Sequence, residues 1–288
     1  MKFKKRYITI FLLAIIIAGN QLGCMTASKS EQEQREIISK KGGPEPQFGS
    51  YQINGRNIHY TSAGNDTLPL VIFVHGSPGS SADMLDYLAD SILLKGARVV
   101  TVDRPGFGES DYGRPETSIH EQAAVLVPLI EKLRYPKVIL VGHSLGGPVI
   151  ARFAMDYPNL VDGLVIVAGS VDPELEPSTW WKRPFDLPLI RLLVPSALRI
   201  SNSEILPLRG ELEKMLPDWS KITCPVTVIQ GTQDDLVDAD NADFARKMLT
   251  NSSSVKINML ENENHFIMWT KNKIIVAEIL EMMNDSPQ

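Results

Sequence analysis

The feature that most constrains the fold is a series of short strand-like segments that recur along the chain, all but the first of them apolar and rich in Val and Ile. They occupy residues 57–61, 70–74, 99–102, 137–141, 163–167 and 226–229. Most of them lack polar alternation, which indicates strands buried on both faces, as in a parallel sheet. Helix-length amphipathic stretches lie between them, at residues 82–94, 120–133, 148–157, 239–249 and 273–283. Strands that alternate with helices in this way predict a doubly wound α/β fold with a mostly parallel sheet.

One segment breaks this alternation. Residues 171–217 are rich in proline and contain Trp180 and Trp181, and they separate the run at 163–167 from the run at 226–229. We expect them to form a short helical cap inserted over the carboxyl ends of the strands, the edge at which open parallel sheets form their sites.

The sequence Gly-His-Ser-Leu-Gly-Gly at residues 142–147 directly follows a buried run. A serine on a sharp strand-to-helix turn has a strained backbone, so the residues two positions away must be small. Gly142 and Gly146 meet that requirement, and Pro148 suits the first turn of a helix, where its missing N–H has no partner. The pattern predicts that Ser144 is a nucleophile.

A nucleophilic serine needs a histidine base and an acid that orients the histidine. In the expected chain order of serine, acid and histidine, Asp234 follows the run at 226–229, and His265 follows the next apolar stretch. We therefore predict that Asp234 is the acid and His265 the general base. Asp235 and Asp172 are the alternative acids.

The same chemistry needs backbone donors for a developing oxyanion. Residues 75–79, His-Gly-Ser-Pro-Gly, follow another buried run, and we expect the amides of Ser77 and Leu145 to be the two donors. His75 is expected to brace its loop rather than to act as a second base. His143 is expected to be a packed neighbour of the nucleophile.

Together with Asp-Arg-Pro-Gly-Phe-Gly-Glu-Ser at residues 103–110, these motifs resemble the ordered motif set of the α/β-hydrolase fold-1 superfamily. The resemblance implies an eight-stranded, mostly parallel sheet with a short helical cap, in a domain over residues 51–288. It implies a triad of Ser144, Asp234 and His265, and only a structural role for the turn at 103–110.

The resemblance indicates little about the substrate. Hydrolysis of a small-molecule carboxylic ester through an acyl-enzyme on Ser144 is the leading interpretation. An aminopeptidase or amidase, or a carbon–carbon bond hydrolase, is the alternative on the same triad, and a non-catalytic binding protein is a third. Epoxide hydrolases and haloalkane dehalogenases resemble the family but place Asp at the position of Ser144. An amine-bearing substrate would need an acidic partner, and the insertion offers Glu174, Glu176, Glu204 and Glu211.

The N-terminus is typical of an export signal. A basic segment at residues 2–6 precedes an apolar run at 7–18 that is too short to favour a membrane-spanning helix. We expect a signal peptide over residues 1–23. Its ending resembles the lipobox of bacterial lipoproteins, although Gln21 stands where that family prefers Leu. The resemblance implies that Cys24 is lipidated and anchors the protein to a bacterial membrane, facing the periplasm or the exterior; a secreted or signal-anchored protein is the alternative.

Residues 24–50 are polar and charged. Such a composition buries too little apolar surface to order itself, so we expect a flexible tether that holds the catalytic domain away from the bilayer. A short helix over residues 31–39 is the one regular element that this segment suggests.

Charge and cysteine content limit the other functions. The formal net charge is −5 with no extended basic block after the N-terminus, which argues against nucleic acid as a partner. Two cysteines are too few for a disulfide framework, and Cys224 is expected to be an inert core thiol. Neither metal-ligand spacing nor a nucleotide-binding loop occurs, so we expect no metal and no cofactor.

Overall fold

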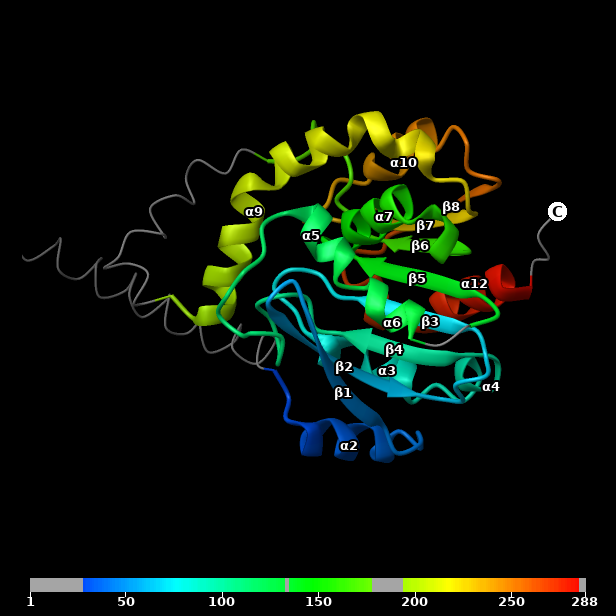
Figure 1. Ribbon diagram of the computed structural model, residues 1–288. Helices are drawn as coiled ribbons and strands as arrows, with labels where there is room; N and C mark the ends of the chain where they lie inside the picture. The colour runs from blue at the N-terminus through cyan, green and yellow to red at the C-terminus, as the bar shows by residue number, and fades with distance from the viewer. Residues whose placement is uncertain (1–27, 133–134, 178–193, 285–288) are drawn as a thin grey trace, which may run out of the picture.

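The computed structural model describes residues 28–132, 135–177 and 194–284 (Figure 1). Its centre is an eight-stranded sheet in the order β1-β2-β4-β3-β5-β6-β7-β8. The strands are β1 (Gln47–Ile53), β2 (Arg56–Ala63), β3 (Leu70–Val74), β4 (Arg98–Val102), β5 (Val138–His143), β6 (Gly163–Val167), β7 (Val226–Gly231) and β8 (Val255–Leu260). β2 pairs antiparallel with β1 and β4, and all other pairings are parallel. The predicted mostly parallel α/β sheet is confirmed.

Helices cover both faces of the sheet (Figure 1). One face carries α5 (Ile119–Ala124), α6 (Val127–Glu131), α7 (Gly146–Asp156) and α10 (Asn241–Met248). The other carries α2 (Glu31–Lys40), α3 (Leu85–Leu88), α4 (Leu93–Gly96), α11 (Ile267–Thr270) and α12 (Asn272–Asn284). On β3, Leu70, Ile72 and Val74 pack in the first layer, and Val71 and Phe73 pack in the second. The unbroken apolar run is explained by these two cores.

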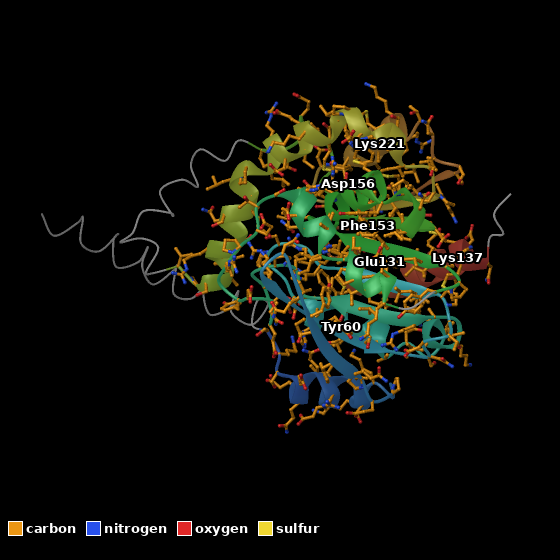
Figure 2. All side chains as sticks on the ribbon, viewed as in Figure 1. Tyr60, Glu131, Lys137, Phe153, Asp156 and Lys221 are labelled. Carbon is orange, nitrogen blue, oxygen red and sulfur yellow. The ribbon has the colours of Figure 1, made fainter. Side chains whose placement is uncertain are left out.

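Helix α7 has a buried apolar side and charged residues beside it. Phe153 is fully buried in the first core, and Asp156, the last residue of the helix, pairs with Arg152 (Figure 2). The apolar stripe of the helix therefore faces the sheet, and its charged residues lie at the edge of that stripe.

Parallel pairing brings the ends of β3 and β5 together at one edge of the sheet. Val74, the last residue of β3, pairs with Gly142 near the end of β5. We call residues 75–79 the β3 loop and residues 142–147 the elbow. The two turns are neighbours because their strands are neighbours.

Residues 31–50 contradict the expected flexible tether. A capping box between Ser30 and Glu33 begins α2. Its Ile38 is fully buried in the second core, and its Gln34 accepts a 2.9 Å hydrogen bond from the hydroxyl of Thr61. β1 then adds a strand before residue 51. The composition argument fails because a short helix that docks on a finished sheet needs few apolar residues of its own.

The predicted insertion contains α9 (Ser196–Met215) in its described part. This long helix lies at the edge of the domain, beyond α5 and α7 (Figure 1). Ile200, Glu204, Leu208 and Leu212 are buried at intervals of four residues, which places them on one face. Glu204 is the only acid among these four residues, and the other three are apolar.

The predicted signal peptide, Cys24 and residues 178–193 of the insertion lie outside the described residues. Within the residues that are described, no helix is both long and apolar enough to cross a bilayer. The signal peptide and the lipid anchor therefore stay predictions.

Candidate active site

The elbow has the strained geometry that its sequence predicts. Ser144 has a φ of 53°, in the left-handed region that residues other than glycine rarely occupy. A Cβ on Gly142 would collide with the Gly146 backbone, and a Cβ on Gly146 would collide with the Val74 carbonyl. The turn can close only because these two positions lack side chains. It places Ser144 between the end of β5 and the start of α7.

His265 is paired with Asp234, and not with Asp235 or Asp172. Asp234 Oδ2 lies 2.8 Å from His265 Nδ1, and Asp234 Oδ1 accepts hydrogen bonds from the amides of Leu236 and Val237 at 2.9 and 2.8 Å. Burial opposes ionisation of Asp234, but these hydrogen bonds keep its pKa below the ordinary value. An ionised carboxylate accepts a hydrogen bond from Nδ1–H, so Nε2 keeps its lone pair.

His143 holds His265 beside the elbow. Its ring lies 4.9 Å from the His265 ring, and its Nε2 lies 3.3 Å from the His265 carbonyl oxygen, to which it can donate. Trp269 also packs against His143, with ring centroids 5.0 Å apart. Burial and the neighbouring His265 lower the pKa of His143 to about 3, so it is neutral. The expected role of His143 as a packed neighbour is confirmed.

His143, the residue before Ser144, packs against His265, which brings the base to the elbow. Among the described residues, no hydrogen bond joins the Ser144 hydroxyl to His265. Such bonds are often loose in proteins without substrate and tighten when the substrate arrives.

The β3 loop lies against the elbow. A Cβ on Gly76 would come within 2.9 Å of the Ser144 Cβ, which shows how closely the loop backbone approaches this serine. The amides of Ser77 and Leu145, the predicted oxyanion donors, are therefore on two turns that flank Ser144. Neither amide donates to another described residue.

His75 braces the β3 loop, as predicted. The Arg104 amide donates to His75 Nε2 at 3.0 Å, so Nδ1 carries the proton and donates to the Gly76 carbonyl at 2.7 Å. Burial and the Arg104 charge lower the pKa of His75 to about 3. This imidazole is neutral and both of its nitrogens are occupied, so it is not a second base.

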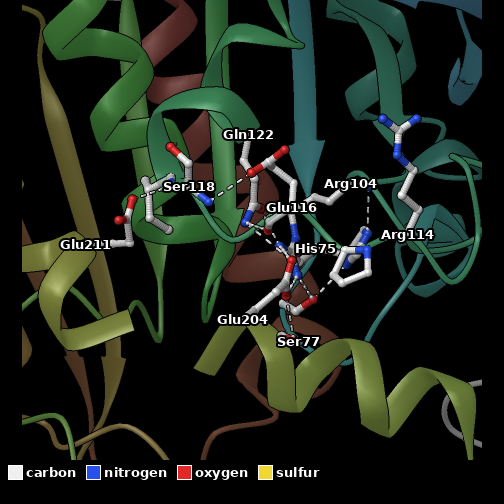
Figure 3. A network of polar contacts seen from close by, with 12 residues as sticks. His75, Ser77, Arg104, Arg114, Glu116, Ser118, Gln122, Glu204 and Glu211 are labelled. Carbon is white, nitrogen blue, oxygen red and sulfur yellow. Dashed lines mark hydrogen bonds and ion pairs between the residues drawn. The ribbon is translucent and has the colours of Figure 1, made fainter. Parts of the chain in front are cut away.

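The Arg104 side chain also contacts the β3 loop, and it pairs with Glu204 of α9 (Figure 3). Both side chains are 1% exposed. Glu204 is therefore not available to bind a substrate amine. Of the other candidates, Glu174 and Glu211 pair with cations and Glu176 accepts a hydrogen bond from Ser170. Sequence reasoning missed the Arg104–Glu204 pair, because no local pattern links residues 100 positions apart.

Three further side chains that could take part in catalysis have structural surroundings that account for them. His59 pairs with Asp103, and His120 pairs with Asp156. Burial raises the pKa of the Cys224 thiol to about 12, so it stays protonated and unreactive, as expected for an inert thiol. Potential ligand atoms of Glu31, His59 and Glu109 lie within 4.8 Å of one another, away from the elbow, and His59 bonds to Asp103 through Nδ1, while its buried Nε2 has no hydrogen-bond partner among the described residues.

The arrangement of strands and turns matches known proteins. A family model described as the alpha/beta hydrolase fold matches residues 69–189. A solved structure of a membrane phospholipase A, described as a novel bacterial virulence factor, aligns with a TM-score of 0.65 over 97% of this chain and 98% of that chain, at 19% identity. This chain has the α/β-hydrolase fold. At that identity the structural likeness establishes the fold alone.

Proteins of assigned function are similar to parts of this chain. Epoxide hydrolase 1 of Caenorhabditis elegans is 31% identical over 178 residues, which are 55% of this chain and 42% of that protein. An sn-1-specific diacylglycerol lipase of Mus musculus is 34% identical over 104 residues, which are 36% of this chain and 34% of that protein. The chain thus spans less than half the length of these relatives.

Proposed function

We propose that this protein is a serine hydrolase that cleaves a small-molecule carboxylic ester through an acyl-enzyme on Ser144. The observation that carries the proposal is the 2.8 Å hydrogen bond between Asp234 and His265, made beside a serine with a φ of 53°. A serine hydroxyl becomes a nucleophile when an oriented histidine takes its proton. The three residues have the chemistry and the neighbourhood for that reaction.

Asp234 determines which nitrogen of His265 acts. Because Nδ1 donates to Asp234, Nε2 accepts the hydroxyl proton as Ser144 Oγ forms its bond to the substrate carbonyl carbon. The carbonyl electrons move to oxygen. When the ester C–O bond breaks, His265 returns the proton to the departing alcohol. Water then attacks the acyl-enzyme by the same route and releases the carboxylic acid.

The developing oxyanion accepts hydrogen bonds from the amides of Ser77 and Leu145. Both amides are free to donate among the described residues, and they flank Ser144 from two different turns. One such donor contributes about 3 kcal/mol to transition-state stabilisation. The oxyanion site is thus divided between the β3 loop and the elbow.

Three observations bear on the substrate class. The glutamates that could receive an amine are engaged with Arg104, Arg209, Lys214 and Ser170. The diacylglycerol lipase relative is named for an ester substrate. The epoxide hydrolase relative belongs to a class with Asp at the nucleophile position, where this chain has Ser144.

A fluorophosphonate probe tests the nucleophile. The wild-type protein should be labelled at Ser144, and Ser144→Ala should remain unlabelled while it keeps the wild-type unfolding curve. A panel of nitrophenyl esters of increasing acyl length, with aminoacyl nitroanilides as the amide arm, tests the substrate class. Equal labelling of the two proteins would exclude the serine mechanism, and turnover of the anilides alone would make the protein an amidase.

We further propose that the protein is a lipoprotein of a bacterial cell envelope, attached to the membrane through Cys24. The support is the basic and apolar N-terminal pattern that ends in Leu-Gly-Cys. Multiple acyl chains would anchor it stably. Metabolic labelling with a fatty acid should mark the wild type and not Cys24→Ala, with Cys224→Ala as the matched control. Equal labelling of the wild type and Cys24→Ala would refute the anchor.

A further inference from the structure

The β3 loop is held by one guanidinium. Arg104 Nε donates to the His75 carbonyl at 2.9 Å, and its Nη2 donates to the Gly76 carbonyl at 2.8 Å. The ring of Phe107 lies 4.9 Å from the guanidinium carbon and covers it. Two consecutive carbonyls of the loop therefore converge on a single buried cation.

A single carboxylate completes this arrangement. Glu204 accepts from Nη1 and Nη2 of Arg104 at 2.9 and 3.1 Å, a bidentate pair. The Ser77 hydroxyl donates to the same carboxylate at 2.9 Å, and the Gln122 amide nitrogen lies 3.3 Å from it. Glu204 thus holds the loop twice, through Arg104 and directly through Ser77.

Glu204 reaches the loop from α9, 127 positions away from Ser77 in the sequence (Figure 3). It is the acid on an otherwise mostly apolar buried face of that helix. Burial raises the pKa of Glu204, and the Arg104 charge opposes that rise. A buried carboxylate persists in such a place only with its partners, so the helix and the loop must dock together.

We propose that Glu204 is a positioning residue for the reaction: it sets the place of the Ser77 amide, and thereby makes docking of α9 a condition for oxyanion stabilisation. The inference rests on the proposed function of that amide. Loss of one oxyanion donor lowers kcat by about 100–1,000-fold, and a displaced donor loses part of that. Since the loop does not carry the nucleophile or the base, the loss appears in kcat more than in KM.

Glu204→Gln removes the charge with little change of shape, and Leu212→Ala is its matched control. Leu212 is fully buried on the same helix, in the apolar core, so its truncation lowers stability while the bonds of Glu204 to the loop stay in place. Glu204→Asp is a milder variant that keeps the charge but is one methylene too short to hold Arg104 and Ser77 together. Each protein is studied below its own unfolding temperature.

With a short-chain ester, Glu204→Gln should lower kcat by about 10–100-fold and Glu204→Asp by about 10-fold, with KM changed less than about threefold. Leu212→Ala should keep kcat within about threefold despite a lower Tm. Hydrogen exchange of the Gly76, Ser77 and Gly79 amides should quicken in the Glu204 variants only, a readout that does not depend on turnover.

Equal loss of kcat in Leu212→Ala, or wild-type exchange of the loop amides in both Glu204 variants, would overturn the positioning role. A wild type without Ser144-dependent turnover would instead refute the proposed function, and the exchange comparison would still report whether Glu204 holds the loop.

Discussion

The elbow and the β3 loop are adjacent turns at one edge of the sheet, and they are held in opposite ways. The elbow is kept closed by its own backbone and by the absence of side chains at Gly142 and Gly146. The β3 loop is kept in place by side chains that are distant in the sequence: Arg104, 29 positions from His75, and Glu204, 127 positions from Ser77.

The two turns are therefore sensitive to substitutions in different parts of the chain. A turn that closes on its own backbone fails when its own residues change. A turn that depends on distant partners tolerates the loss of a side chain such as that of Ser77 as long as those partners stay, although Gly76 has little room for a side chain of its own. If both flank the same nucleophile, as proposed, catalysis depends on one local and one long-range condition.

The largest effect is expected from breaking the elbow with Gly146→Ala. The new Cβ would meet the Val74 carbonyl and lie 3.0 Å from the His75 carbonyl oxygen, so backbone must move. Overpacking against backbone should lower the free energy of unfolding by about 3 kcal/mol and abolish labelling of Ser144. Urea unfolding and the fluorophosphonate probe measure the two losses.

Gly210→Ala is the matched control for that substitution. A Cβ on Gly210 has nothing within 4 Å, and the residue lies inside α9. Alanine there should raise the free energy of unfolding by about 0.5–1 kcal/mol. If Gly146→Ala kept wild-type stability and labelling, the elbow would be as tolerant as the β3 loop, and the contrast between the two turns would be lost.

The same contrast explains how much could be predicted from the sequence. The elbow was predictable because its glycines, its serine and the strand before it are contiguous, and the parallel strands were predictable because their apolar runs are local. Asp234 and His265 follow strand ends in a known order, so their pairing was also within reach. Each of these features is encoded within a few residues.

The features that sequence reasoning missed are contacts between residues that only the folded chain brings together. The Arg104–Glu204 pair joins a turn after β4 to a helix of the insertion. The sequence placed Arg104 in a structural turn and offered Glu204 as a partner for a substrate amine, but no pattern in it joined the two residues. Likewise, the polar composition of residues 31–40 did not predict that Ile38 is fully buried against the sheet. Burial of a charge or of a lone apolar residue is a property of the assembled core.

Acid should weaken both turns, because each contains a buried neutral imidazole. The pKa values of His75, in the β3 loop, and His143, in the elbow, are lowered to about 3. The unfolded chain protonates both below about 6.5, and the folded chain does not, so protons favour unfolding between these values. The free energy of unfolding should fall by roughly 2 kcal/mol for each imidazole between pH 7 and pH 5.

Urea unfolding at pH 7, 6 and 5 measures this slope. His143→Gln keeps a nitrogen donor near the His265 carbonyl, and His75→Asn keeps one near the Gly76 carbonyl, but neither side chain titrates. Each variant should reduce the slope by up to about 1.4 kcal/mol per pH unit. Slopes equal to that of the wild type would mean that these imidazoles do not bind protons differently in the two states.

The smallest effect is expected from Ser77→Ala, which changes the β3 loop while leaving its anchors. The substitution removes the 2.9 Å hydrogen bond to Glu204 but keeps the Ser77 amide and the Arg104 contacts to the loop. Loss of one hydrogen bond should lower the free energy of unfolding by about 1 kcal/mol, and kcat should fall less than in Glu204→Gln. Urea unfolding and steady-state kinetics of the two variants side by side measure the difference. A loss of kcat in Ser77→Ala as large as in Glu204→Gln would mean that the loop depends on its own residue after all, in the manner of the elbow.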